Sequence, residues 1–377
     1  MADSSLDDSD ASMLARMRLH LVAGVGPIMQ QRLLESFGCA SKVFEASAAV
    51  LREIDGIGPK LAQSIIEAKH SDEAERELRR CREAGVRIMC PELPGYPQSL
   101  LTIPDPPQVL FAKGEFLPRD ELALAIVGSR RCTVYGQQQA EKLAGTLARA
   151  GVTIVSGLAR GIDAAAHRGA LAAGGRTIAV LGTGLGNIYP EEHQELAVAI
   201  SNSGSVISES RLDQHPSPGL FPQRNRVISG LSMGVLIVEA TRNSGALHTA
   251  RHAMEQGRDV MAVPGRIDSL ASDGCHDLIR DGATLVRHAD DVLKSLGPLM
   301  SPVRTDSNQE IRSARELSLS EQELVVLNLV TSDPQHLDEL LRSTALDPSR
   351  TLGTLTVLEM KRLVRRMPGG YFVRAMY

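Results

Sequence analysis

Short apolar runs alternate with amphipathic segments between residues 122 and 286, and this alternation constrains the fold more than any other feature. The candidate strands are Leu122–Val127, Thr153–Val155, Thr177–Leu181, Ser205–Ser208, Val235–Val238, Val260–Val263 and Thr284–Val286. Candidate helices between them are Gln137–Arg149, Ile162–Ala173, Glu191–Ser201 and Ala246–Gln256. Strands this continuously apolar are typical of a parallel sheet with helices on both faces. The sequence therefore predicts a doubly wound, extended Rossmann-like α/β domain over residues 89–297, with its ligand at the carboxyl ends of the strands.

A helical domain is predicted ahead of the sheet, over residues 13–88. VAGVGP at 22–27 and IDGIGP at 54–59 repeat a Gly-x-Gly-Pro core after 32 residues, each time between two helical segments. Glycine suits the tight turn, and proline suits the first turn of the next helix. The pattern is typical of helix-hairpin-helix motifs, whose free backbone N–H groups can hold a phosphate. A helical hairpin that only packs would have the same pattern.

The flanking segments have distinct compositions. Residues 1–12 hold four aspartates and are expected to be a disordered acidic tail, and residues 298–316 are expected to be a linker. Six prolines between 91 and 114 predict an irregular lead-in to the sheet. Residues 317–377 predict a winged helix, with a first helix capped by Ser318, two more at His336–Ser343 and Ser349–Met360, and a hairpin over Leu363–Arg374.

The overall charge excludes a protein coated in basic surface. The formal net charge is −4, and the four aspartates of the tail account for it. Any affinity for nucleic acid must then come from local patches. The five cysteines form no C-x-x-C pair, and no apolar run approaches the length of a membrane span. We therefore expect a cytoplasmic protein with reduced thiols and no membrane partner.

Polar, glycine-bearing turns follow several of the predicted strands. Gly128-Ser129-Arg130 follows the first strand, and the segment from Ser156 and Gly157 to Gly161 follows the second. Glycines there let the backbone approach a phosphate, and an arginine can clamp it with two hydrogen bonds. These turns predict phosphate contacts at one edge of the sheet.

The stretch FPQRNRVISGLS at 221–232 combines an aromatic ring with cations ahead of an expected helix start. Arg224 and Arg226 supply cations, Asn225 supplies an amide, and Phe221 supplies a flat apolar face. Single-stranded nucleic acid is bound through this mixture, because the cations hold the backbone and a base stacks on the ring. The alternative is a solvated loop that caps a helix.

The sequence motifs for dinucleotide binding, metal binding and nucleophilic catalysis are weak or missing. The loop GTGLGN at 182–187 lacks the third glycine of a dinucleotide site, and His248 and His252 lack an evident third metal ligand. The chain also has no Gly-x-Ser-x-Gly nucleophile turn. We therefore predict no cofactor, no metal and no catalytic residue.

Several motifs resemble those of the DNA processing protein A (DprA, also called Smf) family. They are GSRRCTVYG, SGLARGIDAAAH, TIAVLGTGL, NIYP, FPQRNRVISGLS, VLIVEATRNSGALHTARHAMEQGR and AVPG. The resemblance implies a protein without established catalytic activity that binds and protects single-stranded DNA in natural transformation. It also implies delivery of that DNA to RecA recombinase and homodimers formed through the central domain. It places DNA contacts on Gly128, Ser129, Arg130, Ser156, Gly157, Gly161, Phe221, Arg224, Asn225 and Arg226.

The sequence departs from the family just before Phe221. Members often have a basic residue there, whereas this chain has HPSPGL at 215–220. Arg224, Asn225 and Arg226 are then expected to contribute more of the binding.

The sequence also allows two alternative hypotheses about function. The same loops could hold a nucleotide in a phosphoribohydrolase-like enzyme, although Arg251 stands near the position where those enzymes have a carboxylate. The winged helix could instead be the main contact with DNA through Lys361, Arg362, Arg365 and Arg366, or it could be a protein-docking module.

Overall fold

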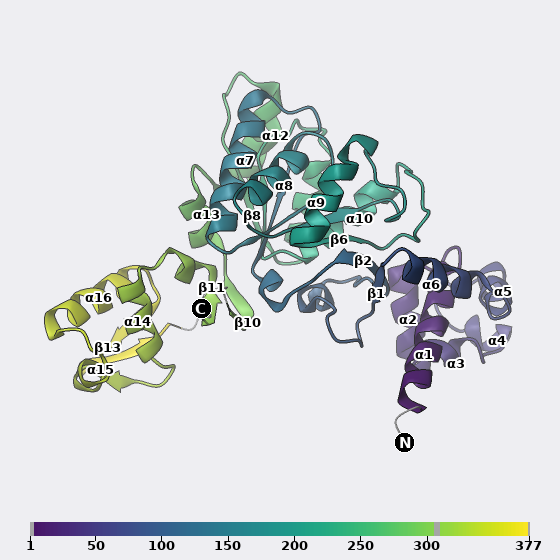
Figure 1. The fold of residues 1–377 in the computed structure, drawn as a ribbon, viewed down its shortest axis with the longest axis horizontal. Coiled ribbons are helices and arrows are strands. Elements are labelled where there is room, and N and C mark those ends of the chain that lie inside the picture. Colours follow the sequence, from purple (N-terminus) through teal and green to yellow (C-terminus); the bar gives the residue numbers. More distant parts are fainter. Residues whose placement is uncertain (1–3, 305–309, 376–377) are drawn as a thin grey trace. The chain divides into compact units, whose positions relative to one another are not determined.

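The computed structural model describes residues 4–304 and 310–375, which divide into two compact units after residue 291 (Figure 1). The first unit contains a helical part and a large sheet. The second unit is small and is described separately below.

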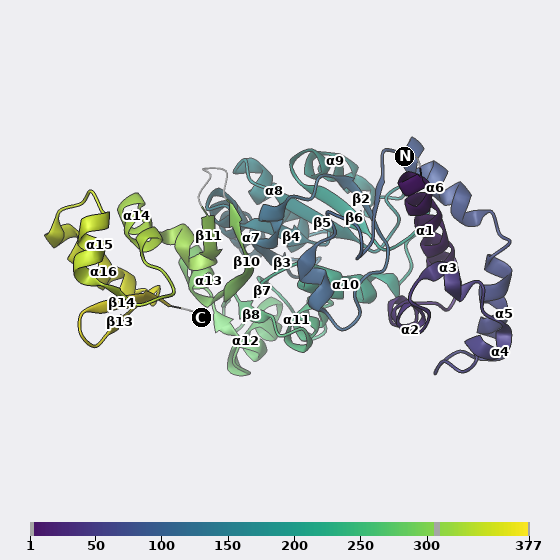
Figure 2. The same ribbon diagram turned by 90° about the horizontal axis from the view of Figure 1, so that it is seen from below.

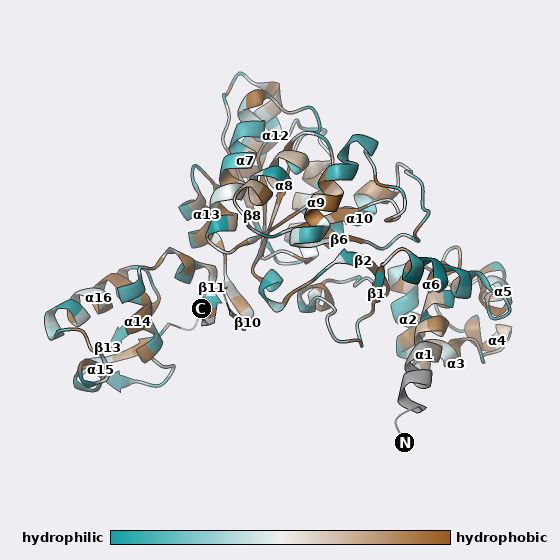
Figure 3. Ribbon diagram, in the orientation of Figure 1, coloured by the Kyte–Doolittle hydropathy of each residue, from teal (hydrophilic) through white to brown (hydrophobic). Residues whose placement is uncertain are grey.

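The sheet confirms the predicted α/β fold. In the described residues it has nine strands in the order β1-β2-β6-β5-β4-β3-β7-β8-β9, and the seven from β6 to β9 are mutually parallel. Their bounds are β3 Ala123–Val127, β4 Thr153–Ser156, β5 Thr177–Leu181, β6 Ser205–Ser208, β7 Gly234–Ile237, β8 Asp259–Ala262 and β9 Thr284–Leu285. The five residues of β3 and of β5 are all buried, which explains the continuous apolar runs (Figure 3).

Two antiparallel strands extend one edge of the sheet. β2 (Leu110–Gly114) pairs with β6, and β1 (Arg87–Met89) pairs with β2. The expectation that residues 91–114 are wholly irregular is therefore wrong at their end. Three prolines at 104–107 precede a short run that is buried from Val109 to Ala112.

Helices cover both faces of the sheet (Figure 2). One layer holds α7 (Val134–Arg149), α8 (Ile162–Ala172) and α9 (Gln194–Ser203). The other holds α10 (Leu220–Gly230), α11 (Ala246–Glu255) and α12 (Asp273–Arg280). Short 3-10 helices lie at Gln98–Thr102, Pro118–Glu121, Glu191–His193 and Leu270–Ser272.

The strand order has a reversal point beside β3. The chain runs from β3 through β4, β5 and β6 on one side and then places β7 on the other side of β3. A hydrogen bond from the Ser129 N–H to the Glu239 carbonyl (2.7 Å) joins the loops that leave β3 and β7. Ligands of such sheets bind at this reversal, outside the carboxyl ends of the strands.

The helical part consists of α1 (Ser4–Leu21), α2 (Pro27–Phe37), α3 (Ala40–Val43), α4 (Ala48–Leu51), α5 (Pro59–Ala68) and α6 (Glu73–Glu83). Both Gly-x-Gly-Pro repeats form the expected turns, with Gly24 and Gly56 at φ of +90° and +91° and a proline opening the next helix. α1 starts at Ser4, so the expectation of a disordered tail over 1–12 is corrected from that residue on. Residues 1–3 lie outside the described residues.

The second unit contains a winged helix, as predicted. Its helices are α14 (Glu321–Leu329), α15 (Leu337–Ser343) and α16 (Pro348–Met360), and β12 (Gln335–His336), β14 (Tyr371–Arg374) and β13 (Val364–Met367) form the wing sheet. Ser320, rather than Ser318, caps the first helix, because its hydroxyl accepts from the Glu323 N–H. α13 (Ala289–Ser295) spans the division between the two units.

The expected linker at 298–316 is largely ordered. β10 (Pro298–Arg304) pairs with β11 (Glu310–Ser313), and a 3-10 helix follows at Ala314–Ser318. The residues between the two strands, 305–309, lie outside the described part. No described helix is long and apolar enough to cross a membrane.

Candidate nucleic-acid interface

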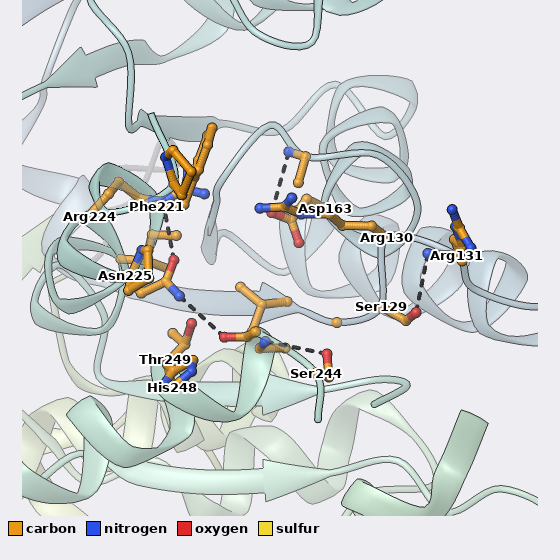
Figure 4. Close-up of a pocket in the computed structure, with 18 of the residues that line it drawn as sticks. Ser129, Arg130, Arg131, Asp163, Phe221, Arg224, Asn225, Ser244, His248 and Thr249 are labelled. Carbon is orange, nitrogen blue, oxygen red and sulfur yellow. Dashed lines mark hydrogen bonds between the residues drawn. The ribbon is translucent and has the colours of Figure 1, made fainter. Parts of the chain in front are cut away.

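A cavity of about 830 Å³ opens at the reversal point of the sheet. Its walls come from the loop after β3, from α10 and from the loop after β7 with the start of α11 (Figure 4). The segment at 216–218 completes them. Six of the ten predicted contact residues line it, and these are Gly128, Ser129, Arg130, Phe221, Arg224 and Asn225. The structure thus gathers segments that are more than 90 residues apart in the sequence.

Helix α10 sets which residues of the FPQRNR stretch reach the cavity. The stretch lies inside α10, so the expectation that it precedes a helix is wrong. Phe221, Arg224, Asn225 and Ile228 follow the i, i+3, i+4, i+7 spacing of one helix face, and all four line the cavity. This spacing leaves Arg226 on a different face.

Arg226 corrects the expectation of a phosphate contact there. Its side chain is 4% exposed and is absent from the lining of the cavity. The guanidinium pairs with Asp105 (3.0 Å) and Glu209 (2.5 Å). Arg226 is therefore a buried ion-pair residue that anchors α10.

Arg224 lines the cavity, but its guanidinium is already hydrogen-bonded to other groups of the protein. Its Nη1 donates to the carbonyls of Gly157 (2.7 Å) and Val180, and its Nε donates to the Asn225 side chain (3.2 Å). Burial lowers the pKa of Arg224 to about 10, so the side chain remains charged at pH 7. Arg224 therefore ties together the ends of β4 and β5 and adds positive charge to the cavity wall.

Asp163 supports the same loop from α8. Its carboxylate accepts from the backbone N–H groups of Gly157 (3.1 Å) and Ala159 (3.4 Å). Burial raises the pKa of Asp163, and the positive charge of Arg224 opposes that rise. This carboxylate shapes the loop and neutralises part of the arginine charge.

Arg130 and Phe221 meet at the mouth of the cavity. The Arg130 guanidinium carbon lies 5.1 Å from the centre of the Phe221 ring, a cation–π contact. Arg130 is exposed, and Phe221 is half-buried. The structure therefore places an exposed cation and an aromatic face next to each other.

The remaining predicted residues build the loops without lining this cavity. Ser156 is fully buried, and its hydroxyl donates to the Ile126 carbonyl (2.6 Å), which corrects its expected role as a DNA contact. Gly161 has a φ of +75° and passes so close to the Ser129 carbonyl that a Cβ would lie 2.3 Å from it. A Cβ on Gly157 would lie 2.4 Å from the Arg224 guanidinium. Both glycines are needed for packing.

The contacts predicted from the sequence do not include several residues of the lining, although most of these residues lie within the family motifs. These are Arg131, Ala159, Tyr189, Pro216, Ser217, Pro218, Pro222, Thr241, Ser244, Gly245, Ala246, His248 and Thr249. The available signal was position after a strand, because Tyr189 follows β5 and the polar turn that contains Ser244 and Gly245 follows β7 on the same edge. The segment Pro216–Pro218 contributes no cation, in line with the missing basic residue noted above.

The residues considered for metal binding do not form a cluster. His248 lines the cavity, while His252 lies 3.4 Å from Glu255 on α11. Within the described ranges, no three histidine, cysteine, aspartate or glutamate side chains are placed to share a metal ion.

Comparison with known proteins gives the family. The model of the DNA recombination-mediator protein A family matches residues 87–297, which contain every residue that lines the cavity. The chain belongs to this family. A model of the DprA winged helix domain also matches, at residues 311–370 in the second unit.

Other members of the DNA recombination-mediator protein A family resemble the chain over most of its length. Protein Smf of Synechocystis is 34% identical over 94% of this chain and 96% of its own. The crystal structure of DprA from Streptococcus pneumoniae is 36% identical, covers 75% of this chain and 96% of its own, and has a TM-score of 0.66. DprA from Helicobacter pylori, described for its single-stranded DNA binding mode, is 32% identical over 56% of this chain and 97% of its own, with a TM-score of 0.51.

Proposed function

We propose that the cavity beside β3 binds single-stranded DNA, and that the protein protects such strands and loads RecA recombinase onto them during natural transformation. The observation that carries the proposal is the exposed Arg130 next to the Phe221 ring at the mouth of the cavity. The Helicobacter pylori relative, described for binding single-stranded DNA, supports the choice of ligand. The recombination-mediator description of the family supports the role with RecA.

A single strand suits this geometry better than a duplex. A phosphate can bind the exposed guanidinium groups of Arg130 and Arg131, which belong to one loop. A base can then stack on Phe221 or enter the cavity behind it, but only when it is unpaired and turned out of its stack. Arg224 adds positive charge to the wall without having to release its carbonyl partners.

We further propose that the protein acts by binding alone. Asp163 is the one carboxylate among the described residues that line the cavity, and two backbone N–H groups occupy it. Glu239, at the end of β7, accepts from the N–H (2.8 Å) and hydroxyl (2.5 Å) of Thr133 at the start of α7. Neither carboxylate is free to act as the base of a phosphoribohydrolase.

The phosphate contact of Arg130 gives the first test. Arg130→Ala should weaken binding of an oligothymidylate and lower the slope of log K against log salt by about 0.7, because one phosphate contact is lost. Fluorescence anisotropy titrations at several salt concentrations measure both quantities.

Arg149→Ala is the matched control, because Arg149 is exposed at the far end of α7. It should leave the slope unchanged. An equal loss of slope in both variants would show that Arg130 contributes only general positive charge.

We also propose a homodimer formed through the central domain. The Tyr135 hydroxyl donates to the Pro264 carbonyl (3.1 Å) and joins the start of α7 to the loop after β8. In these two segments Val134, Ile267 and Leu270 are 72%, 94% and 77% exposed. Large apolar side chains this exposed are typical of an interaction surface.

Ile267→Glu tests this surface. It should shift the sedimentation of the protein from dimer to monomer at micromolar concentration, because a buried unpaired charge opposes association. Met254→Glu, at an exposed position on α11, should leave the dimer intact. Two variants that both remain dimeric would place the interface elsewhere.

We propose a cytoplasmic location, which suits a partner of RecA. The five cysteines are all free thiols, and Cys81, Cys90 and Cys275 are buried. Free thiols are usual in a reducing compartment.

A further inference from the structure

A row of four side chains crosses the mouth of the cavity. Arg130 lies over Phe221, the Phe221 and Tyr189 ring centres are 5.7 Å apart, and the Arg160 guanidinium carbon lies 6.0 Å from the Tyr189 ring centre. Cations thus stand at both ends of a pair of aromatic rings. The row continues beyond the main cavity, whose lining includes Tyr189 but not Arg160.

A small second hollow lies under this row. Its volume is about 20 Å³, enough for one water molecule or one phosphate oxygen but too small for a base. Arg130, Arg160, Tyr189 and Phe221 line it, together with Gly157 and Arg224 among others. Three guanidinium groups around one small hollow favour an anion there.

Arg160, the cation at the outer end of the row, is already paired with the carboxylate of Glu192. Arg160 donates from Nε to Glu192 Oε1 and from Nη2 to Glu192 Oε2 (2.9 Å), so the pair is bidentate. A phosphate offers two oxygens in the same arrangement. The Glu192 carboxylate therefore has the position and the charge of a bound phosphate.

We propose that Arg160 is a second phosphate site and that Glu192 competes with the DNA strand for it. The inference rests on the proposed binding of single-stranded DNA at the adjacent cavity. A strand whose base stacks on Phe221 continues along Tyr189, and its next phosphate displaces Glu192 from Arg160. The pair is about half exposed on both sides, so it is weak enough to be displaced.

Glu192→Gln tests the competition directly. The substitution keeps the size of the side chain and removes its charge, and it should raise the affinity for an oligothymidylate about two- to fivefold, the range set by an exposed ion pair. Glu191→Gln is the matched control, because Glu191 is also exposed and lies next to Glu192 in the same 3-10 helix. It should raise the affinity by less.

Arg160→Ala completes the experiment. It should weaken binding, lower the salt slope by about 0.7, and remove the gain from Glu192→Gln in the double variant. The competition would be overturned if Glu192→Gln and Glu191→Gln raised the affinity equally. It would also be overturned if Glu192→Gln still raised the affinity in a protein that carries Arg160→Ala.

The same titrations separate this inference from the function on which it rests. Wild-type protein that fails to bind the oligothymidylate would contradict both. Wild-type protein that binds, with an affinity that Phe221→Ala lowers and Glu192→Gln leaves unchanged, would contradict only the competition at Arg160.

Discussion

Phe221→Ala is expected to weaken binding of an oligothymidylate by roughly 5- to 150-fold, the equivalent of about 1–3 kcal/mol for one stacked base. The ring lies at the mouth of the cavity between Arg130 and Tyr189, where a turned-out base would meet it. The salt slope should change little, because stacking releases no counterions. Anisotropy titrations of a labelled oligonucleotide at several salt concentrations measure both effects.

Two further substitutions at this position separate stacking from packing. Phe221→Tyr keeps the aromatic ring and should retain nearly all of the affinity. Phe221→Leu keeps an apolar side chain without the ring and should bind almost as weakly as Phe221→Ala. Unchanged affinity in Phe221→Ala would contradict the role of the ring.

Arg224→Met is expected to lower the free energy of unfolding of the first unit by about 3 kcal/mol. The substitution leaves the carbonyls of Gly157 and Val180 without a side-chain donor, and it removes the positive charge that faces the buried Asp163. A methionine fills much of the same space, so loss of hydrogen bonds and charge dominates the effect. Differential scanning calorimetry should show a fall of at least about 5 °C in the transition of the first unit.

Arg149→Met is the control for this measurement, because the exposed Arg149 contacts only Thr146 on its own helix among the hydrogen bonds of the described chain. It should change the transition by less than about 1 °C. A similar small change in Arg224→Met would show that the buried network adds little to stability.

The sheet was predictable because burial on both faces demands apolar residues throughout a strand. All seven parallel strands lie within about one residue of their predicted bounds. β2 was missed because three prolines at 104–107 made its whole neighbourhood look irregular, although all three precede the strand and leave its hydrogen bonds to β1 and β6 intact. The pairing of β10 with β11 was missed because these two strands contain polar residues without a clear alternation.

The location of the candidate site was predictable from the sequence. The interaction partners of each arginine were not. The turns after β3 and β4 identified the correct edge, because parallel strands bring their carboxyl ends together. Arg224 and Arg226 looked equivalent two residues apart, yet they point to different faces of α10 and neither is a free cation. The carbonyl and carboxylate partners of both come from distant segments, which no local pattern shows.

The most direct test of the central claim is the affinity of the wild-type protein for an oligothymidylate compared with a duplex of the same length, measured over a range of salt. The proposed stacking on Phe221 needs an unpaired base, so we expect the single strand to bind at least tenfold more tightly than the duplex. The slope of log K against log salt should correspond to two or more phosphate contacts, at about 0.7 each. Equal or tighter binding of the duplex would contradict a single-strand site at the carboxyl edge of the sheet.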